Sequence, residues 1–351
     1  MLTADRRALH QIPELDRTLP KTSAYIRSVL RALPCRILTP WEDAVCAYFD
    51  FGKTETIAFR SDMDALPGTE LTGLPFASTH PGCMHACGHD GHMAILLGLA
   101  RHLAEHPAPR NVLLIFQPAE ETTGGAKAIC DTGILEAHNV SRIYGLHLWP
   151  ELPKGQVASC SGGMMARTCK IQIEISGKSV HLARWQTGND ALLAAVRFVD
   201  RTYTLAEGKP CLLRFGTMQS GSVQNSLSDH SVLAGALRCF EDALFFQLWD
   251  RLHEIAAQIG QETGCTLTLS RTEGYPPVTN DPAALEEARQ RWPIGTAQPT
   301  FIAEDFSEYQ RRVPGVFFWL GTGGPAALHS PHFDFDESIL ETGLDLFRAL
   351  L

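Results

Sequence analysis

The sequence contains no hydrophobic run of the roughly 20 residues that a membrane-spanning helix needs. Its opening segment, MLTADRRALHQIPEL, has no apolar stretch like that of a secretory signal, so we expect a cytoplasmic protein with no membrane partner. Basic residues are also in deficit, since 30 Lys and Arg face 39 Asp and Glu and the net charge is −9. A nucleic-acid surface needs a basic patch, so we expect no nucleic-acid partner either.

Cysteine is too sparse for a disulfide scaffold, because ten cysteines are spread over 351 residues. We expect most of them to be small buried hydrophobic side chains. Internal repeats and low-complexity segments are missing too, which argues against a repeat architecture. The chain is longer than most single domains, so we expect two domains, or one domain that carries an insertion.

Four short apolar segments are typical of buried parallel strands: residues 56–59, 111–116, 142–146 and 315–320. Between the first two, apolar residues at positions 93, 96, 97, 100 and 103 form one face of a helix in the segment HMAILLGLARHLAEH. This succession of strand, helix and strand predicts a layered α/β domain with a mostly parallel sheet.

The middle of the chain has a different pattern. The segment KIQIEIS at 170–176 alternates apolar and polar residues, as strands of antiparallel sheets do. Further strands are expected at 211–218, 231–240 and 265–270, and helices at 190–203 and 242–262. The resulting β-α-β-β-α-β order is the ferredoxin-like unit. We therefore predict an inserted α+β domain at 166–272, within a discontinuous α/β domain of residues 1–165 and 273–351.

Residues capable of catalysis or metal binding gather after the buried strands and before the first long helix. In chain order these residues are Asp62, Asp64, Cys87, His89, Asp90, Glu120, Glu121, His147, His329 and His332. Open α/β sheets bind their ligands beyond the carboxyl ends of the strands. We therefore expect these groups to meet at one edge of the sheet.

The segment MHACGHDGH, residues 84–92, has three interpretations. It could be a solvated loop in which Asp90 caps the helix. It could hold a nucleophile, since a helix N-terminus lowers the pKa of a thiol such as Cys87. It could also bind metal through Cys87 and His89, whose donors suit a borderline divalent ion. His85 and His92 are interpreted as non-functional.

The segment PAEE favours the metal. The adjacent carboxylates of Glu120 and Glu121 repel each other unless a positive charge lies nearby. A metal ion resolves the repulsion, because one carboxylate binds it and the other remains free to carry a proton. The alternative, two solvated glutamates near the positive end of a helix, leaves the neighbouring cysteine and histidines unexplained.

Several segments together match a known pattern: RSDMDALP, GLPFASTHPGCMHACGHDGH, IFQPAEE, GLHLWPELPKG, EDF and LHSPHFDFDE. With them the chain resembles, over nearly its whole length, the metallopeptidase-like amidohydrolases of the aminoacylase/hippuricase type. That group includes N-acyl-amino-acid deacylases, hippurate hydrolases, auxin-conjugate hydrolases and N-acetyldiaminopimelate deacetylases.

The resemblance implies two divalent metal ions per subunit, manganese or zinc, with cobalt and nickel as alternatives. The ligands that it implies are Cys87, His89, Glu121, His147 and His329. It assigns Glu120 as the general base and acid, and Asp64 as a group that orients a ligand or the bridging solvent. A metal-activated water would then attack the amide carbonyl.

The family also implies a lid histidine that stabilises the oxyanion, and here His181 in GKSVHLARWQTGND takes that position. The surrounding residues depart from the usual pattern, which has paired glycines before the histidine and Pro-His after it. This chain has Ser179-Val180 and Trp185-Gln186 instead. Asn225 in VQNSLSDH would bind substrate, or would simply occupy a turn. The resemblance also implies a homodimer formed through the inserted domain.

The resulting hypothesis is a deacylase of small N-acylated amino acids. Alternatives within the same chemistry are deacetylation of N-acetyldiaminopimelate in lysine biosynthesis and cleavage of aryl-acyl conjugates. A metal-independent hydrolase that uses Cys87 would ignore chelators, and it leaves Glu120, Glu121 and His329 unexplained. A non-catalytic binding protein on this scaffold would be favoured only if Glu120 had been lost.

Overall fold

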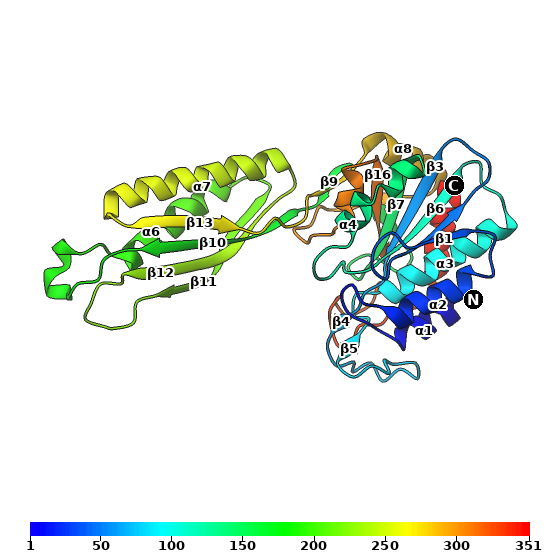
Figure 1. Cartoon of the computed structure of the whole chain (residues 1–351), viewed down its shortest axis with the longest axis horizontal. Helices are drawn as coiled ribbons and strands as arrows, with labels where there is room; N and C mark the ends of the chain where they lie inside the picture. The colour runs from blue at the N-terminus through cyan, green and yellow to red at the C-terminus, as the bar shows by residue number, and fades with distance from the viewer. The chain divides into compact units, whose positions relative to one another are not determined.

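The computed structural model describes residues 1–351 and divides them into two compact units (Figure 1). The large unit comprises Met1–Met164, Thr279–Gln298 and Glu304–Leu351, and the small unit comprises Met165–Val278 and Pro299–Ala303. The predicted fold class is confirmed, because the large unit is an α/β domain with a mostly parallel sheet and the small unit is a separate antiparallel α+β domain. None of the helices combines the length and the apolar composition needed to cross a membrane.

An eight-stranded sheet in the order β1-β2-β6-β3-β7-β16-β8-β15 forms the centre of the large unit. Its strands are β1 (Arg36–Leu38), β2 (Val45–Phe49), β3 (Thr56–Asp62), β6 (Asn111–Gln117), β7 (Val140–Trp149), β8 (Val157–Ser159), β15 (Gly295–Thr296) and β16 (Gly315–Gly321). Strands β6, β3, β7 and β16 run parallel to one another, and they are the four strands that the apolar segments predicted. All four are longer than predicted; β3 extends to Asp62, and β7 includes His147.

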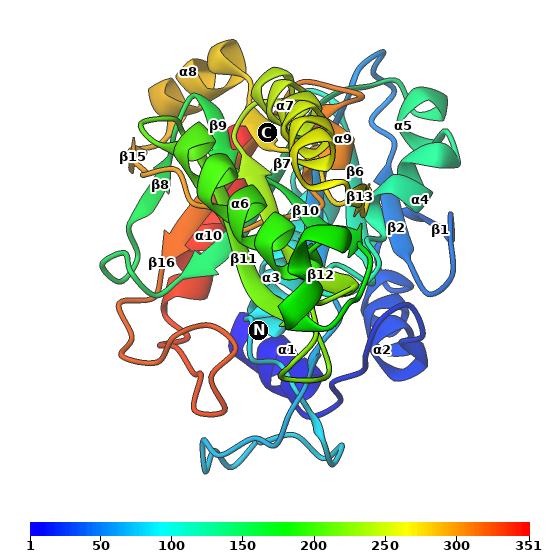
Figure 2. The ribbon, with the colours of Figure 1, turned by 90° about the vertical axis from the view of Figure 1, so that its left-hand side faces the viewer.

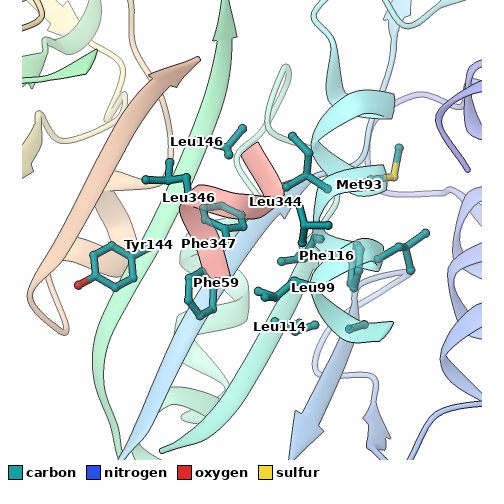
Figure 3. Close-up of a cluster of buried hydrophobic side chains, with 14 of the residues drawn as sticks. Phe59, Met93, Leu99, Leu114, Phe116, Tyr144, Leu146, Leu344, Leu346 and Phe347 are labelled. Carbon is teal, nitrogen blue, oxygen red and sulfur yellow. The ribbon is translucent and has the colours of Figure 1, made fainter. Parts of the chain in front are cut away.

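The core of the large unit lies between this sheet and the helices α3 (His89–Glu105) and α10 (Ile339–Leu350), as Figure 3 shows. The rings of Phe59 in β3 and Phe347 in α10 lie 4.9 Å apart between centroids. Leu99 of α3 and Leu114 of β6 belong to the same buried cluster. Burial of apolar surface contributes about 25 cal/mol per Å². This packing therefore fixes α3 against the strands, and with it the loops at their carboxyl ends.

Shorter elements complete the large unit and the connections. The remaining helices are α1 (Leu2–His10), α2 (Pro20–Leu30), α4 (Ala126–Asp131), α5 (Ile134–Ala137), α8 (Pro282–Arg291) and α9 (Ser307–Gln310). Two small two-stranded sheets pair β4 (Leu66–Pro67) with β5 (Cys83–Met84) and β9 (Gly162–Met165) with β14 (Val278–Asn280).

Helix α3 begins at His89, earlier than the predicted start at His92, and its N-cap is Gly88. Gly88 has φ +85°, and a Cβ there would lie 2.8 Å from a side-chain atom of Leu148, so only glycine fits this turn. The interpretation of Asp90 as a cap in a solvated loop is wrong. Asp90 lies in the first turn of the helix, is fully buried, and accepts a hydrogen bond from Arg6.

The small unit has the predicted β-α-β-β-α-β order. Its elements are β10 (Arg167–Ser176), α6 (Ala191–Tyr203), β11 (Cys211–Ser220), β12 (His230–Cys239), α7 (Asp242–Thr263) and β13 (Thr266–Arg271), with the 3-10 helices η1 (Leu182–Thr187) and η2 (Thr204–Ala206). The strands form an antiparallel sheet in the order β11-β12-β10-β13. Figure 2 shows α6 and α7 side by side on one face of this sheet, where their apolar residues form a second core.

Candidate metal centre

Side chains from separate segments of the large unit converge at the carboxyl ends of the parallel strands. The Sγ atom of Cys87, just before α3, lies 3.3 Å from Nε2 of His147 in β7 and 3.3 Å from Nε2 of His329 in the loop after β16. Oε1 of Glu121, in the loop after β6, lies 3.3 Å from Nε2 of His329 and 3.9 Å from Nε2 of His89. The structure therefore brings all of the predicted ligands together. Their binding of metal stays a prediction.

Hydrogen bonds orient two of the histidines so that a lone pair faces the cluster. Nδ1 of His89 donates to the backbone oxygen of Asp64 at 2.8 Å, and Nδ1 of His147 donates to the backbone oxygen of Leu148 at 2.7 Å. In each ring the proton is thereby assigned to Nδ1, which leaves Nε2 as an acceptor. Nε2 of His89 is buried without any hydrogen-bond partner. An orphaned acceptor beside a thiol and a carboxylate fits a borderline divalent ion.

Two other groups of potential ligands lie close by, one of Asp62, His89, His92 and His147 and one of Glu120, Glu304 and Asp305. Nδ1 of His92 donates to Asp62 at 2.6 Å, and Nε2 of His92 accepts from the backbone N–H of Leu148 at 2.9 Å. The second oxygen of Asp62 accepts from Arg60 at 2.9 Å. Both ring nitrogens of His92 are therefore engaged, and each carboxylate oxygen of Asp62 already accepts a hydrogen bond, so these two residues brace the structure around the cluster.

The remaining histidines named in the sequence lie outside the cluster. His85 is buried and neighbours the ring of His10, with 6.3 Å between ring centroids. His332 is exposed, and its Nδ1 lies 3.0 Å from the backbone oxygen of Leu71. Neither residue belongs to a group of potential metal ligands.

Asp64 holds the Glu120–Glu121 segment in place. Its two carboxylate oxygens accept the backbone N–H groups of Glu120 and Glu121, each at 3.0 Å. The same residue accepts the hydrogen bond from His89 through its backbone oxygen. Ala119 and His329 both have positive φ, 64° and 65°, in a region that side chains other than glycine rarely adopt. Such strained backbone is typical of functional sites that the surroundings over-determine.

A buried charge network that was not predicted from the sequence lies behind Glu120. The guanidinium of Arg60 in β3 lies 3.0 Å from Glu304 and 2.8 Å from Asp305, besides its contact with Asp62. Gln117 donates to both oxygens of Asp305 at 2.9 and 2.7 Å. The segment EDF was noted as part of the resemblance without a role. The signal that could have found the network is an arginine inside an otherwise apolar strand.

The two adjacent glutamates have opposite pKa shifts. Burial raises the pKa of Glu120 well above its ordinary value, and the neighbouring carboxyl groups of Glu304 and Glu121 add to the effect. Burial also opposes the ionisation of Glu121, but hydrogen bonding to His329 is the largest effect in the other direction, and the pKa is lowered to about 2. Where the surroundings of two neighbouring carboxyl groups separate their pKa values, the group with the raised pKa can exchange protons and the other remains an anion.

The thiol of Cys87 is not set up as a free nucleophile. Burial raises the pKa of this thiol well above its ordinary value, and the carboxylates of Glu121 and Glu120 raise it further. This is the reverse of the depressed pKa that a nucleophilic cysteine needs. A cation bound between these groups would favour the thiolate, which fits a metal ligand.

The predicted substrate-binding residues lie in the small unit. Nδ1 of His181 accepts from the backbone N–H of Ala183 at 3.2 Å, so a neutral ring carries its proton on Nε2. The backbone N–H of Leu182 donates to the backbone oxygen of Asn225 at 3.0 Å, which joins the two segments. Both side chains remain candidates for contact with a substrate.

A known protein family covers most of this chain. Residues 58–351 match the model of peptidase family M20/M25/M40. The chain belongs to this family. The predicted resemblance is thereby confirmed, and so is the enzyme class: a hydrolase of carbon–nitrogen bonds with a metallopeptidase-like, metal-dependent site.

Several full-length relatives within peptidase family M20 share one name. The chain is 36% identical over 359 residues to an N-acetyldiaminopimelate deacetylase of Shouchella clausii (strain KSM-K16), which covers 99% of this chain and 96% of that protein. It is 35% identical over 367 residues to the enzyme of the same name from Streptococcus suis (strain 05ZYH33), and the match covers 100% of this chain and 98% of that protein. Among solved structures, the YXEP protein of Bacillus subtilis, a dinuclear metal-binding peptidase of this family, matches with a TM-score of 0.90 at 31% identity, over 99% of this chain and 96% of that chain.

Proposed function

We propose that this chain is a deacylase that hydrolyses the amide bond of small N-acylated amino acids. The observation that carries the proposal is the difference in pKa between the adjacent residues Glu120 and Glu121. Glu121 has a pKa of about 2 and lies against the cluster of donor atoms, whereas the pKa of Glu120 beside it is raised. One residue is thus suited to bind a cation and the other to transfer a proton.

Each residue then has a task in the reaction. When bound by Cys87, His89, Glu121, His147 and His329, two divalent ions supply Lewis acidity to the amide carbonyl and to the attacking water. Glu120 accepts the proton of that water and delivers it to the nitrogen of the leaving amine. Asp64 keeps Glu120 in position through the hydrogen bond from its backbone N–H.

The developing oxyanion needs a hydrogen-bond donor, and we assign that task to His181. Its ring carries the proton on Nε2 because Nδ1 accepts from the backbone. Asn225 is assigned to the substrate, since its segment is hydrogen-bonded to that of His181. The replacement of the usual Pro-His by Trp185-Gln186 alters the surface next to this histidine.

A homodimer formed through the small unit is also part of the proposal. Helix α6 exposes Leu192, Leu193 and Val196. Strand β11 forms an edge of the antiparallel sheet, so its outer backbone groups can pair with another strand. An exposed apolar face next to an open edge suits a second copy of the same unit.

Within this class, N-acetyldiaminopimelate is the first substrate to test, because full-length relatives at 34–36% identity carry the name of its deacetylase. Other N-acetyl, N-benzoyl and indole-acetyl amino acids form the comparison panel. Amine release is followed after the protein is stripped with a chelator and then reloaded with manganese or zinc. We expect activity to disappear with the metal and to return with it, and the panel then identifies the acyl group.

The same experiment tests the alternative chemistry. A hydrolase that used Cys87 as its nucleophile would keep its activity in the chelator and lose it on alkylation. Activity that is indifferent to metal would therefore overturn the proposal. Stoichiometric metal binding without turnover on any member of the panel would leave the metal centre standing and reject the assigned substrate class.

A further inference from the structure

Besides Arg60, the large unit holds a second deeply buried cation, Arg6 in α1. Its side chain is only 1% exposed. Nε donates to Asp90 at 2.8 Å, one terminal nitrogen donates to Asp334 at 2.8 Å, and the other lies 3.3 Å from Glu337. A buried guanidinium needs such partners, and its planar fork fixes their relative positions in a way that an ammonium group cannot.

The carboxylates that Arg6 joins belong to the segments that carry two of the proposed ligands. Asp90 directly follows His89 in the first turn of α3 and is itself fully buried. Asp334 lies in the same loop as His329, shortly after it in the sequence. The backbone N–H of His329 donates to Ala86 at 2.8 Å, so the two segments also touch beside the cluster.

The surroundings of Arg6 hold it in this position. The guanidinium lies over the rings of Phe76 and Phe335, at 4.9 and 4.4 Å from their centroids. His10, one turn further along α1, reaches the same oxygen of Asp90 at 2.8 Å through Nδ1 and lies 3.2 Å from Glu70 through Nε2. The function proposed above leaves this N-terminal cluster without a task.

We propose that Arg6 is a positioning residue of the metal centre. By joining Asp90 to Asp334, it fixes the spacing between the segments that carry His89 and His329, and it thereby sets the affinity for metal. The inference rests on the proposed function, since it presupposes that these histidines are ligands. His329 has strained backbone with φ 65°, so its loop needs an external anchor of this kind.

The test compares metal affinity in Arg6→Gln and Arg7→Gln. Arg7 is the matched control, because it follows Arg6 in the same helix, hydrogen-bonds Glu337 and lies over Phe76, yet its side chain is 49% exposed and makes no hydrogen bond to Asp90 or Asp334. Dissociation constants for Mn²⁺ and Zn²⁺ are measured by competition with a chelator, well below the unfolding temperature. We expect Arg6→Gln to weaken binding by about 10-fold or more, in the range found for groups that orient ligands, and Arg7→Gln to leave it unchanged.

A second readout separates positioning from a purely structural role. The visible absorption of the cobalt(II)-loaded protein reports the geometry around the ion and the presence of a thiolate ligand. A structural role alone lowers the unfolding temperature and leaves this spectrum and the dissociation constants at their wild-type values, and that result in folded Arg6→Gln would overturn the inference. Arg6→Lys keeps the positive charge but loses the planar, forked guanidinium. We expect its metal dissociation constants to lie between those of the wild type and those of Arg6→Gln.

If Arg6→Gln fails to fold, Asp334→Asn takes its place. Asp334 is partly exposed, at 35%, and its removal breaks one arm of the bridge while the Arg6–Asp90 pair remains. A weaker affinity with an altered cobalt spectrum supports the inference, and wild-type values for both reject it. Wild-type protein that binds neither ion would overturn the proposed function and this inference together, and that result is recognised without any variant.

Discussion

At the scale of single residues, the two adjacent glutamates differ in what surrounds them. Glu121 faces histidines, whereas Glu120 faces other carboxyl groups. We predict that Glu120→Gln lowers kcat by about 100-fold or more, because an amide cannot accept the proton of water. The number of metal ions per chain, measured by elemental analysis, should not change.

The control for this substitution is Glu151→Gln, at an exposed glutamate after β7. It should leave both kcat and metal content at wild-type values. Retained turnover in Glu120→Gln would remove Glu120 from the reaction, and a loss of metal from that variant would make it a ligand instead.

Arg60 supplies the one guanidinium of the buried charge network behind Glu120. Arg60→Met leaves Asp62, Glu304 and Asp305 without their common cation. We predict a loss of about 3–5 kcal/mol in the free energy of unfolding, because a broken buried ion pair leaves uncompensated charge. Urea unfolding of the metal-free protein measures it.

Arg312→Met is the comparison for Arg60→Met. Arg312 pairs with Asp131 at 2.8 Å on the surface, where both side chains are exposed. Its loss should cost about 1 kcal/mol or less. Equal losses in the two variants would show that the buried network does not depend on its arginine.

Cys87, Glu121 and His147 could be found from the sequence because they lie in or close to a strand or helix that the hydrophobic pattern reveals. Glu120 and Glu121 follow the strand at 111–116, and Cys87 precedes the helix. Arg60 could not be connected with Glu304 and Asp305 in the same way, because they are more than 240 positions apart in the chain. Only the pairing of strands and the packing of the loop before α9 bring them together.

At the scale of elements, the buried parallel strands were predicted because strands covered on both faces are continuous apolar runs. The outer strands β1, β8 and β15 were not predicted, since they span only three, three and two residues and show no periodicity. Strand β2 was missed as well: it is a five-residue apolar run, and such runs do not distinguish strand from buried helix. The predicted start of α3 was late, because the left-handed turn at Gly88 and the buried first turn carry no apolar period.

Helix α6 allows a test of the proposed homodimer. Introducing a charge through Val196→Glu, in the middle of the exposed apolar face with Leu192 and Leu193, should prevent association. We predict a dimer for the wild type and a monomer for the variant by light scattering. Leu71→Glu, at an exposed leucine of the large unit, should remain a dimer. A monomeric wild type would reject the proposed assembly.

At the scale of the whole molecule, every predicted ligand belongs to the large unit, so metal should stabilise the two units unequally. A ligand at 100 times its dissociation constant adds about 2.7 kcal/mol to the stability of the state that binds it. We predict that metal slows hydrogen exchange of the slowest amides in β3, β6 and α3 by about 100-fold. This factor corresponds to the added stability of about 2.7 kcal/mol.

The amides of β10, β12 and α7 in the small unit serve as the internal control in that experiment, because none of these elements carries a predicted ligand. Their exchange rates should be the same with and without metal. Equal slowing in both units would mean that they unfold as one cooperative block, or that ions bind outside the large unit. Repeating the measurement with Glu121→Gln separates these two cases, since losing a ligand with a pKa of about 2 should abolish slowing only if the ions bind at the predicted centre.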